Sequence, residues 1–102
     1  MKNRIQFKNL VVSAEDLPKI NQIVRLLTEL APSDAFISIE FNKSDTGFAG
    51  ILKLHSPSEN FSEEANNDAL VPLMKTLFEL SMVHIKEWRR NRFAETHKMG
   101  AS

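Results

Sequence analysis

The feature that most constrains the fold of this chain is a long apolar stripe in its last third. Between about Asp68 and Arg92, apolar or small residues recur at every third or fourth position: Leu70, Leu73, Met74, Leu77, Ser81, Ile85 and Trp88. This spacing is typical of a helix that packs one face against the rest of the protein. The stripe covers about half of the helix circumference. We therefore expect this helix to lie across a sheet, beside another helix, or against a second subunit.

One further helix and four strands are indicated upstream. Apolar residues at helical spacing between Leu17 and Leu30 predict a core helix, which the Ser13 hydroxyl can cap. Apolar and polar residues alternate in four segments, which predict strands: Ile5–Val12, Ala35–Asn42, Phe48–His55 and Asn60–Asn66. Between the second and third strands Ser44–Gly47 predicts a hairpin turn, because Gly47 can adopt a positive φ.

The resulting order, β-α-β-β-β-α, predicts an α+β fold with a four-stranded sheet and two helices packed on one face. The chain has 102 residues, which is enough for a single domain with its own core. We expect that domain to span residues 1–93. The regular pattern is lost after Phe93, so residues 94–102 are expected to form a flexible tail.

Several function classes are not supported by the sequence. There is no cysteine, and His55, His84 and His97 lie far apart without a carboxylate at ligand spacing, so we expect no metal and no cofactor. There is no P-loop, nucleophile elbow or dinucleotide glycine pattern, so we expect neither an enzyme nor a small-molecule substrate. Short apolar runs and the absence of a signal-peptide core predict a cytoplasmic protein with no membrane partner.

Charge is distributed unevenly although the formal net charge is +0. Residues 1–8 contain three basic and no acidic residues, residues 84–102 contain five basic and two acidic residues, and the middle of the chain is acidic. If the two basic ends meet in space, they form a positive surface suited to a polyanion. The alternative is an ordinary mixed-charge surface with slightly basic ends.

The candidate RNA-binding residues are basic side chains at the two ends of the chain and on the third strand: Lys86, Arg89, Arg90, Arg92, Arg4, Lys8 and Lys53. Lys2 and Lys43 are further candidates. Guanidinium groups suit phosphates because their forked donors match paired oxygens. Alternatively, the arginines offset the partial negative charge at a helix C-terminus. Trp88 could stack on a base, but its place on the apolar stripe favours packing. We expect His84 to be a hydrogen-bonded residue at the edge of the core.

The order of elements and four segments resemble the ribosome hibernation-promoting factor family, also called protein Y. The resembling segments are Ile5–Phe7, Val12–Ser13, Gly50–Leu54 and Phe61–Ala65. The resemblance implies a four-stranded sheet with two helices on one face. It also implies a bacterial, ribosome-associated stress-response protein that binds rRNA of the small ribosomal subunit and inhibits translation.

A second hypothesis is a protein-interaction or dimerisation module that keeps the fold but not RNA binding. The neutral net charge and the apolar Met82 and Val83, at positions where the family is usually basic, favour it. Such a module would form a homodimer through the last helix. Without its first strand, the order also resembles a double-stranded-RNA-binding domain, but the basic helix start of that family is absent from Asn66–Val71.

Overall fold

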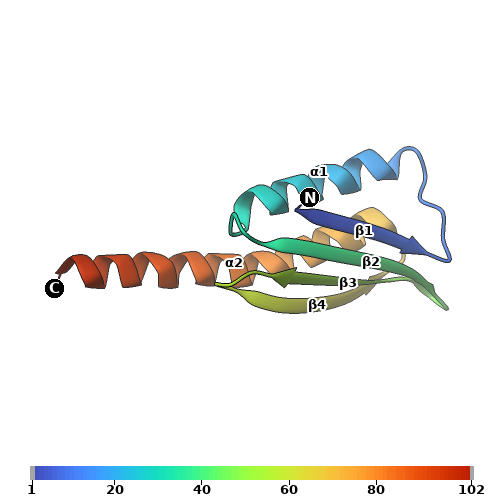
Figure 1. Cartoon of the computed structure of the whole chain (residues 1–102). Coiled ribbons are helices and arrows are strands. Elements are labelled where there is room, and N and C mark those ends of the chain that lie inside the picture. Colours follow the sequence, from blue (N-terminus) through green and yellow to red (C-terminus); the bar gives the residue numbers. More distant parts are fainter. Residues whose placement is uncertain (1, 102) are drawn as a thin grey trace.

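The predicted fold class is confirmed by the computed structural model, which describes the backbone of residues 2–101 and the side chains of residues 2–91. The elements follow the order β-α-β-β-β-α: β1 (Asn3–Lys8), α1 (Asp16–Leu30), β2 (Phe36–Ser44), β3 (Gly47–His55), β4 (Asn60–Asn67) and α2 (Leu70–Ala101). Figure 1 shows the four strands side by side, with the last turns of α2 projecting beyond the sheet.

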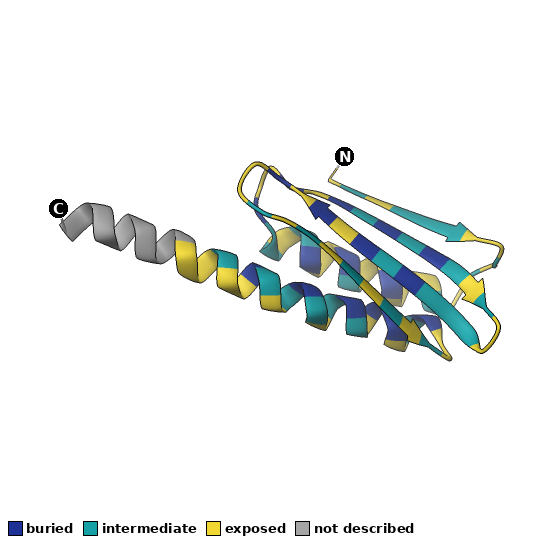
Figure 2. Ribbon diagram, turned by 90° about the horizontal axis from the view of Figure 1, so that it is seen from below, coloured by how far each residue is buried: buried dark blue, intermediate teal, exposed yellow. Residues whose placement is uncertain are grey.

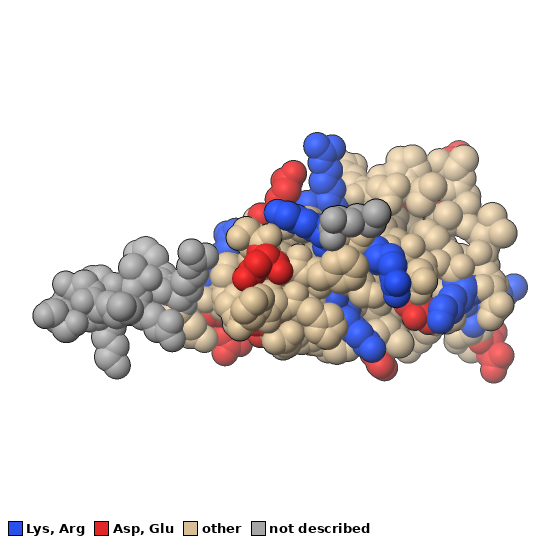
Figure 3. Space-filling view, viewed as in Figure 1, with Lys and Arg blue, Asp and Glu red and all other residues tan. Residues whose placement is uncertain are grey.

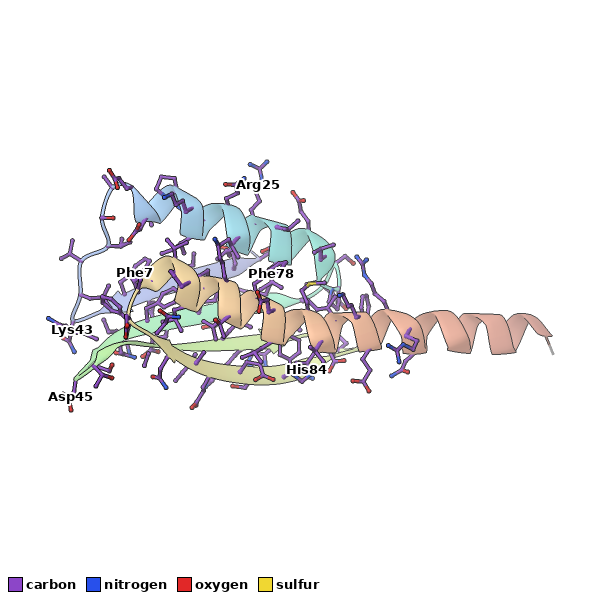
Figure 4. The ribbon with its side chains drawn as sticks, turned by 180° about the vertical axis from the view of Figure 1, so that it is seen from behind. Phe7, Arg25, Lys43, Asp45, Phe78 and His84 are labelled. Atoms are coloured by element: carbon purple, nitrogen blue, oxygen red, sulfur yellow. The ribbon has the colours of Figure 1, made fainter. Side chains whose placement is uncertain are left out.

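The four strands form one sheet in the order β1-β2-β3-β4. β1 pairs with β2 in parallel, and the two are joined through α1, whereas β2, β3 and β4 pair antiparallel through short turns. Both helices cover the same face of the sheet, as the view from behind shows (Figure 4). No described element covers the opposite face, which we call the open face.

Residues of alternating burial in β2 and β3 build the sheet side of the core (Figure 2). Ile37, Ile39 and Phe41 of β2 are at most 1% exposed and face the helices. The helices contribute the apolar residues that the sequence pattern predicted: Ile20, Val24 and Leu27 from α1, and Leu70, Leu73, Met74, Leu77 and Ile85 from α2. The small Ser81 is also fully buried on α2, which lets the helix approach its neighbours closely.

The first strand is shorter than the sequence predicted, because it ends at Lys8 instead of Val12. Asn9 adopts a φ of 59°, a left-handed conformation that interrupts an extended strand and that asparagine tolerates better than most residues. After this turn Leu10 and Val12 still pack against the core, while Val11 is 96% exposed. The apolar run from Leu10 to Val12 is thus partly a core segment, but not a strand.

Side chains of the preceding turns bond to the backbone where the two helices begin, although Glu15, the N-cap residue of α1, makes no side-chain cap hydrogen bond itself. The Ser13 Oγ accepts a hydrogen bond from the Asp16 backbone N–H at 3.1 Å, as predicted. The Asn67 Oδ1 accepts one from the Ala69 N–H at 3.1 Å before α2.

The end of α2 differs from the prediction in one respect. Its backbone continues past Arg92 to Ala101. No proline or glycine, the residues that disfavour a helix most, lies between Arg92 and Gly100. The flexible tail expected for residues 94–102 stays a prediction, because the side chains of these residues lie outside the described ones. Within the described residues, neither helix is both long enough and apolar enough to cross a membrane.

Candidate nucleic-acid interface

The sheet carries three of the candidate RNA-binding residues on its open face. Arg4 and Lys8 are exposed on β1, and Lys53 is exposed on β3. Their side of the sheet follows from alternation, because the neighbouring Asn3 faces the helices and donates from Nδ2 to the Thr28 Oγ1 of α1 at 3.1 Å. Arg4 and Lys53 both pair with Ser38, so they flank it in one row across the sheet.

The helix α2 carries Lys86, Arg89 and Arg90, all exposed, on the helical side of the molecule. The Arg89 Nη2 donates a hydrogen bond to the backbone oxygen of Leu30, at the end of α1, at 3.2 Å. A cation at this place offsets the partial negative charge of the α1 C-terminus. Arg89 thus has a structural role, although its side chain remains exposed. The Arg92 side chain lies outside the described residues.

Apart from Lys8, which pairs with Asn42 near the opposite end of the sheet, the two groups of basic residues lie at the same end but on different faces. This end is formed by the α1–β2 loop, the β3–β4 turn and the turn of α2 around Trp88. Arg4 and Lys53 lie on the open face near this end, whereas Lys86, Arg89 and Arg90 lie on the helical side. Figure 3 shows basic side chains spread along the visible surface, with acidic ones between them. A ligand that contacts both groups must therefore pass around this end of the molecule.

Lys8 is already paired with an acidic side chain. Its Nζ lies 3.1 Å from the Glu40 Oε1, and the Asn42 Nδ2 donates to the same oxygen at 3.3 Å. The hydrogen bond from Lys8, followed by that from Asn42, lowers the pKa of Glu40 below its ordinary value of 4.5. Lys8 is therefore less available to a phosphate than Arg4 or Lys53.

Replacing Lys8 with methionine should raise the pKa of Glu40 towards its ordinary value, because the largest stabilising contact of the carboxylate is removed. The pKa of Glu40 is lowered in the folded protein, so the pair stabilises the fold above the unfolded-state pKa. This stabilisation is lost as the pH falls through the lowered value. NMR titration of the Glu40 carboxyl in both proteins measures the shift. Identical titration midpoints in wild type and Lys8→Met would show that Lys8 does not lower the pKa of Glu40.

A hollow of ≈ 590 Å³ lies at the same end of the sheet, beside Trp88. It is lined by Pro32, Ser33, Asp34, Ser58, Glu59, Trp88 and Asn91. Ser56 shapes the turn below it, because its Oγ accepts hydrogen bonds from the Ser58 and Glu59 N–H groups at 3.2 and 2.8 Å. With two carboxylates in its wall, the hollow does not suit a phosphate. Trp88 is half-buried here, which agrees with the packing role expected from its place on the apolar stripe.

His84 joins α2 to the edge strand β4, as the sequence predicted for a hydrogen-bonded edge residue. Its Nε2 lies 2.6 Å from the Glu63 Oε1, and its ring stacks on Phe61 with centroids 4.3 Å apart and planes 8° apart. Figure 4 shows His84 on the side of α2 that faces the strands. The described residues include no group of three or more His, Cys, Asp or Glu that could hold a metal ion.

We expect a double-mutant cycle between Glu63→Ala and His84→Ala to give a coupling free energy of about 1 kcal/mol, because the pair is half-exposed and short. Urea unfolding of the four proteins measures it. The control is Glu64→Ala, which removes the adjacent carboxylate on the open face and should couple to His84→Ala by no more than about 0.3 kcal/mol. Equal coupling for Glu63 and Glu64 would contradict a specific contact.

Two aromatic residues on the open face were not among the sequence candidates. Phe36 of β2 is 38% exposed, and its cross-strand partner His55 of β3 is also exposed. Phe36 faces outward because it alternates with the buried Ala35 and Ile37, but the sequence alone did not show which side chain would lie beside it. A large aromatic residue on the solvent side of an alternating strand was the available signal.

No family model matches the sequence, and no curated protein sequence matches it. The structure, in contrast, is similar to solved ones. A ribosomal subunit interface protein from Coxiella burnetii superposes with a TM-score of 0.72 at 12% sequence identity, covering 88% of this chain and 99% of that one. The N-terminal domain of Thermus thermophilus protein Y superposes with a TM-score of 0.69 at 8% identity, covering 82% and 93%.

This chain has the fold of those two proteins. The fold implied by the sequence resemblance to the protein Y family is therefore confirmed, over most of the chain. At identities this low, the likeness concerns the path of the backbone and the order of the elements. The partner and the residues that contact it have to be argued from the surface of this chain.

Proposed function

We propose that this chain is a cytoplasmic, non-enzymatic translation inhibitor of the stress response that binds small-subunit rRNA through its basic surface. The observation that carries the proposal is the near full-length similarity in fold to a ribosomal subunit interface protein. The proposed contacts are the basic residues near the α1–β2 end of the sheet: Lys86, Arg89, Arg90, Arg4 and Lys53. Arg92 and the partly neutralised Lys8 are further members of the proposed set.

The geometry of α2 supports phosphate binding at this end. The helix projects past the sheet, so its basic side chains can reach a partner without a clash between that partner and the sheet (Figure 1). Arg90 and Lys86 are exposed, and Arg89 is held in place by its bond to Leu30. A guanidinium fixed in this way loses less conformational freedom when its remaining donors bind a phosphate.

Cosedimentation of the protein with small ribosomal subunits over a range of salt concentrations tests the proposal. Wild type should bind more weakly as salt rises, because phosphate contacts release counterions. The double variant Arg89→Ala/Arg90→Ala should bind about tenfold or more weakly at low salt, with a salt dependence smaller by about two phosphate contacts.

The control variant Lys19→Ala/Arg25→Ala removes the same charge from the exposed side of α1, and Arg25 points away from the body of the molecule in Figure 4. It should bind like wild type. Equal losses in both variants would show that only net charge matters. Binding that does not respond to salt, or no binding of wild type, would refute the proposal.

The alternative of a dimerisation module is favoured by one observation on the helical side. Val83 of α2 is 63% exposed, and Leu26 and Leu17 of α1 are 47% and 37% exposed, so three large apolar side chains of the helices are left to solvent. A homodimer through α2 would cover Val83. Analytical ultracentrifugation distinguishes the two functions, because this alternative requires a dimer that Val83→Asp disrupts, whereas rRNA binding does not.

A further inference from the structure

The open face has a distinct composition near the α1–β2 end. The cross-strand register places two rows of outward side chains there, which we call the aromatic end: Lys2, Phe36, His55 and Asn60 in the first row, and Arg4, Ser38, Lys53 and Ser62 in the second. Lys2 continues the pairing of β1, because its carbonyl accepts a hydrogen bond from the Ile37 N–H at 3.0 Å. These rows lie on the side of the sheet away from both helices.

The charges of the aromatic end are of one sign. Its two rows contain three cations and no carboxylate. The nearest acidic side chains of the open face, Glu40 and Glu64, are in the next row, and the Glu40 carboxylate is held by Lys8. Carboxylates do lie at its margins: Glu40 interacts electrostatically with Lys53, and the Glu59 Oε1 accepts a hydrogen bond from the Asn60 N–H at 3.1 Å. Within the two rows themselves the side-chain charge is positive, which attracts phosphate. The rest of the open face has no such excess of positive charge.

The aromatic rings are accessible rather than part of the core. Phe36 is 38% exposed, and the helices that bury Ile37 lie on the other side of the sheet. Residues paired across antiparallel strands have Cβ atoms about 5 Å apart, so the Phe36 and His55 side chains are immediate neighbours. RNA-binding domains built on four-stranded sheets use exposed rings of this kind to stack unpaired bases.

We propose that the aromatic end binds an unpaired stretch of RNA, with a base stacked on Phe36 and His55 and the flanking phosphates held by Arg4 and Lys53. This inference rests on the proposed function, from which it takes RNA as the partner. It adds which part of the RNA is recognised. Duplex RNA cannot use the site, because its bases are stacked within the helix and cannot reach the rings. The contact is tolerant of sequence, since every base has a stacking face.

Fluorescence anisotropy with a labelled RNA of about ten nucleotides, either alone or annealed to its complement, tests the proposal at low salt. Wild type should bind the single strand about tenfold more tightly than the duplex. Phe36→Leu keeps an apolar side chain but removes stacking, so it should weaken single-strand binding about tenfold and leave duplex binding unchanged. The matched control is Leu26→Ala, which changes an exposed apolar residue on α1 and should have no effect.

Equal affinity for the two RNA forms, or single-strand binding by Phe36→Leu within about twofold of wild type, would overturn the proposal. If Phe36→Leu does not fold by circular dichroism, the NMR signals of the His55 ring in wild type give the answer: they must shift on addition of the single strand and not of the duplex. Ribosome cosedimentation is a separate readout. Its failure alongside single-strand binding would refute the proposed function and leave this site in place.

Discussion

Phe41→Ala should destabilise the protein by about 3–5 kcal/mol, the largest effect that we expect from a single substitution. Phe41 is fully buried at the centre of β2, and its ring stacks on Phe7 with centroids 5.4 Å apart and planes 15° apart. Truncation removes this apolar area from the core and leaves a cavity that neighbours on two strands and α2 cannot fill. Domains of this size have about 5–15 kcal/mol of stability in total. Urea unfolding measures the loss.

The matched control for Phe41→Ala is Phe36→Ala, on the same strand but on the open face. Phe36 is 38% exposed, so its truncation should cost less than about 1 kcal/mol. Both variants replace phenylalanine with alanine in the same strand, so a difference in stability between them reports on the face of the sheet and not on the type of substitution. A similar loss for both variants would mean that the open face is covered in solution, contrary to the arrangement in Figure 2.

Gly47→Ala should destabilise the protein by about 2–4 kcal/mol, for two additive reasons. Gly47 has a φ of +156°, which side-chain-bearing residues rarely adopt. A Cβ at this position would also lie 2.6 Å from the backbone oxygen of Asn67 and 3.0 Å from the Asp68 Cα. These are backbone atoms of the neighbouring β4 end, so they cannot move aside as a flexible side chain can.

The control for Gly47→Ala is Gly50→Ala, in the same strand. Its Cβ would meet only side chains, with the Leu77 Cδ1 at 2.9 Å and the Leu73 Cδ2 and Phe41 Cδ1 at 3.3 Å, and no left-handed backbone is required. Small rotations of these side chains should limit the cost to about 1–2 kcal/mol. Thermal unfolding of both variants shows which substitution lowers the stability more. A larger loss of stability for Gly50→Ala would contradict the backbone strain expected at position 47.

The secondary structure could be predicted because its causes are local. The stripe from Leu70 to Ile85 determines which face of α2 is buried, and the alternation from Ala35 to Phe41 does the same for β2. The prediction was wrong at the end of β1, where the left-handed Asn9 ends the strand although the apolar run continues to Val12. A backbone conformation at one residue leaves little trace in a pattern of side-chain types.

The candidate site was predictable only in part. The sequence shows that both ends of the chain are basic, but the face to which each basic residue points depends on strand pairing. The register places Arg4 beside Ser38 and Lys53, and it places Lys8 against Glu40. The contact of Arg89 with Leu30 joins residues 59 positions apart in the sequence. No local pattern could have predicted these partners.

The sequence by itself determined the elements of this protein, their order and the residues of its core, because hydrophobic periodicity reports directly on which side of a helix or strand is buried. The tertiary structure decided which polar side chains meet. It divided the basic residues between two faces and put Phe36 beside His55 on the open one. Such neighbours arise from pairing between distant segments, and a charge or a ring on an exposed surface leaves no periodic signal that would identify its partner.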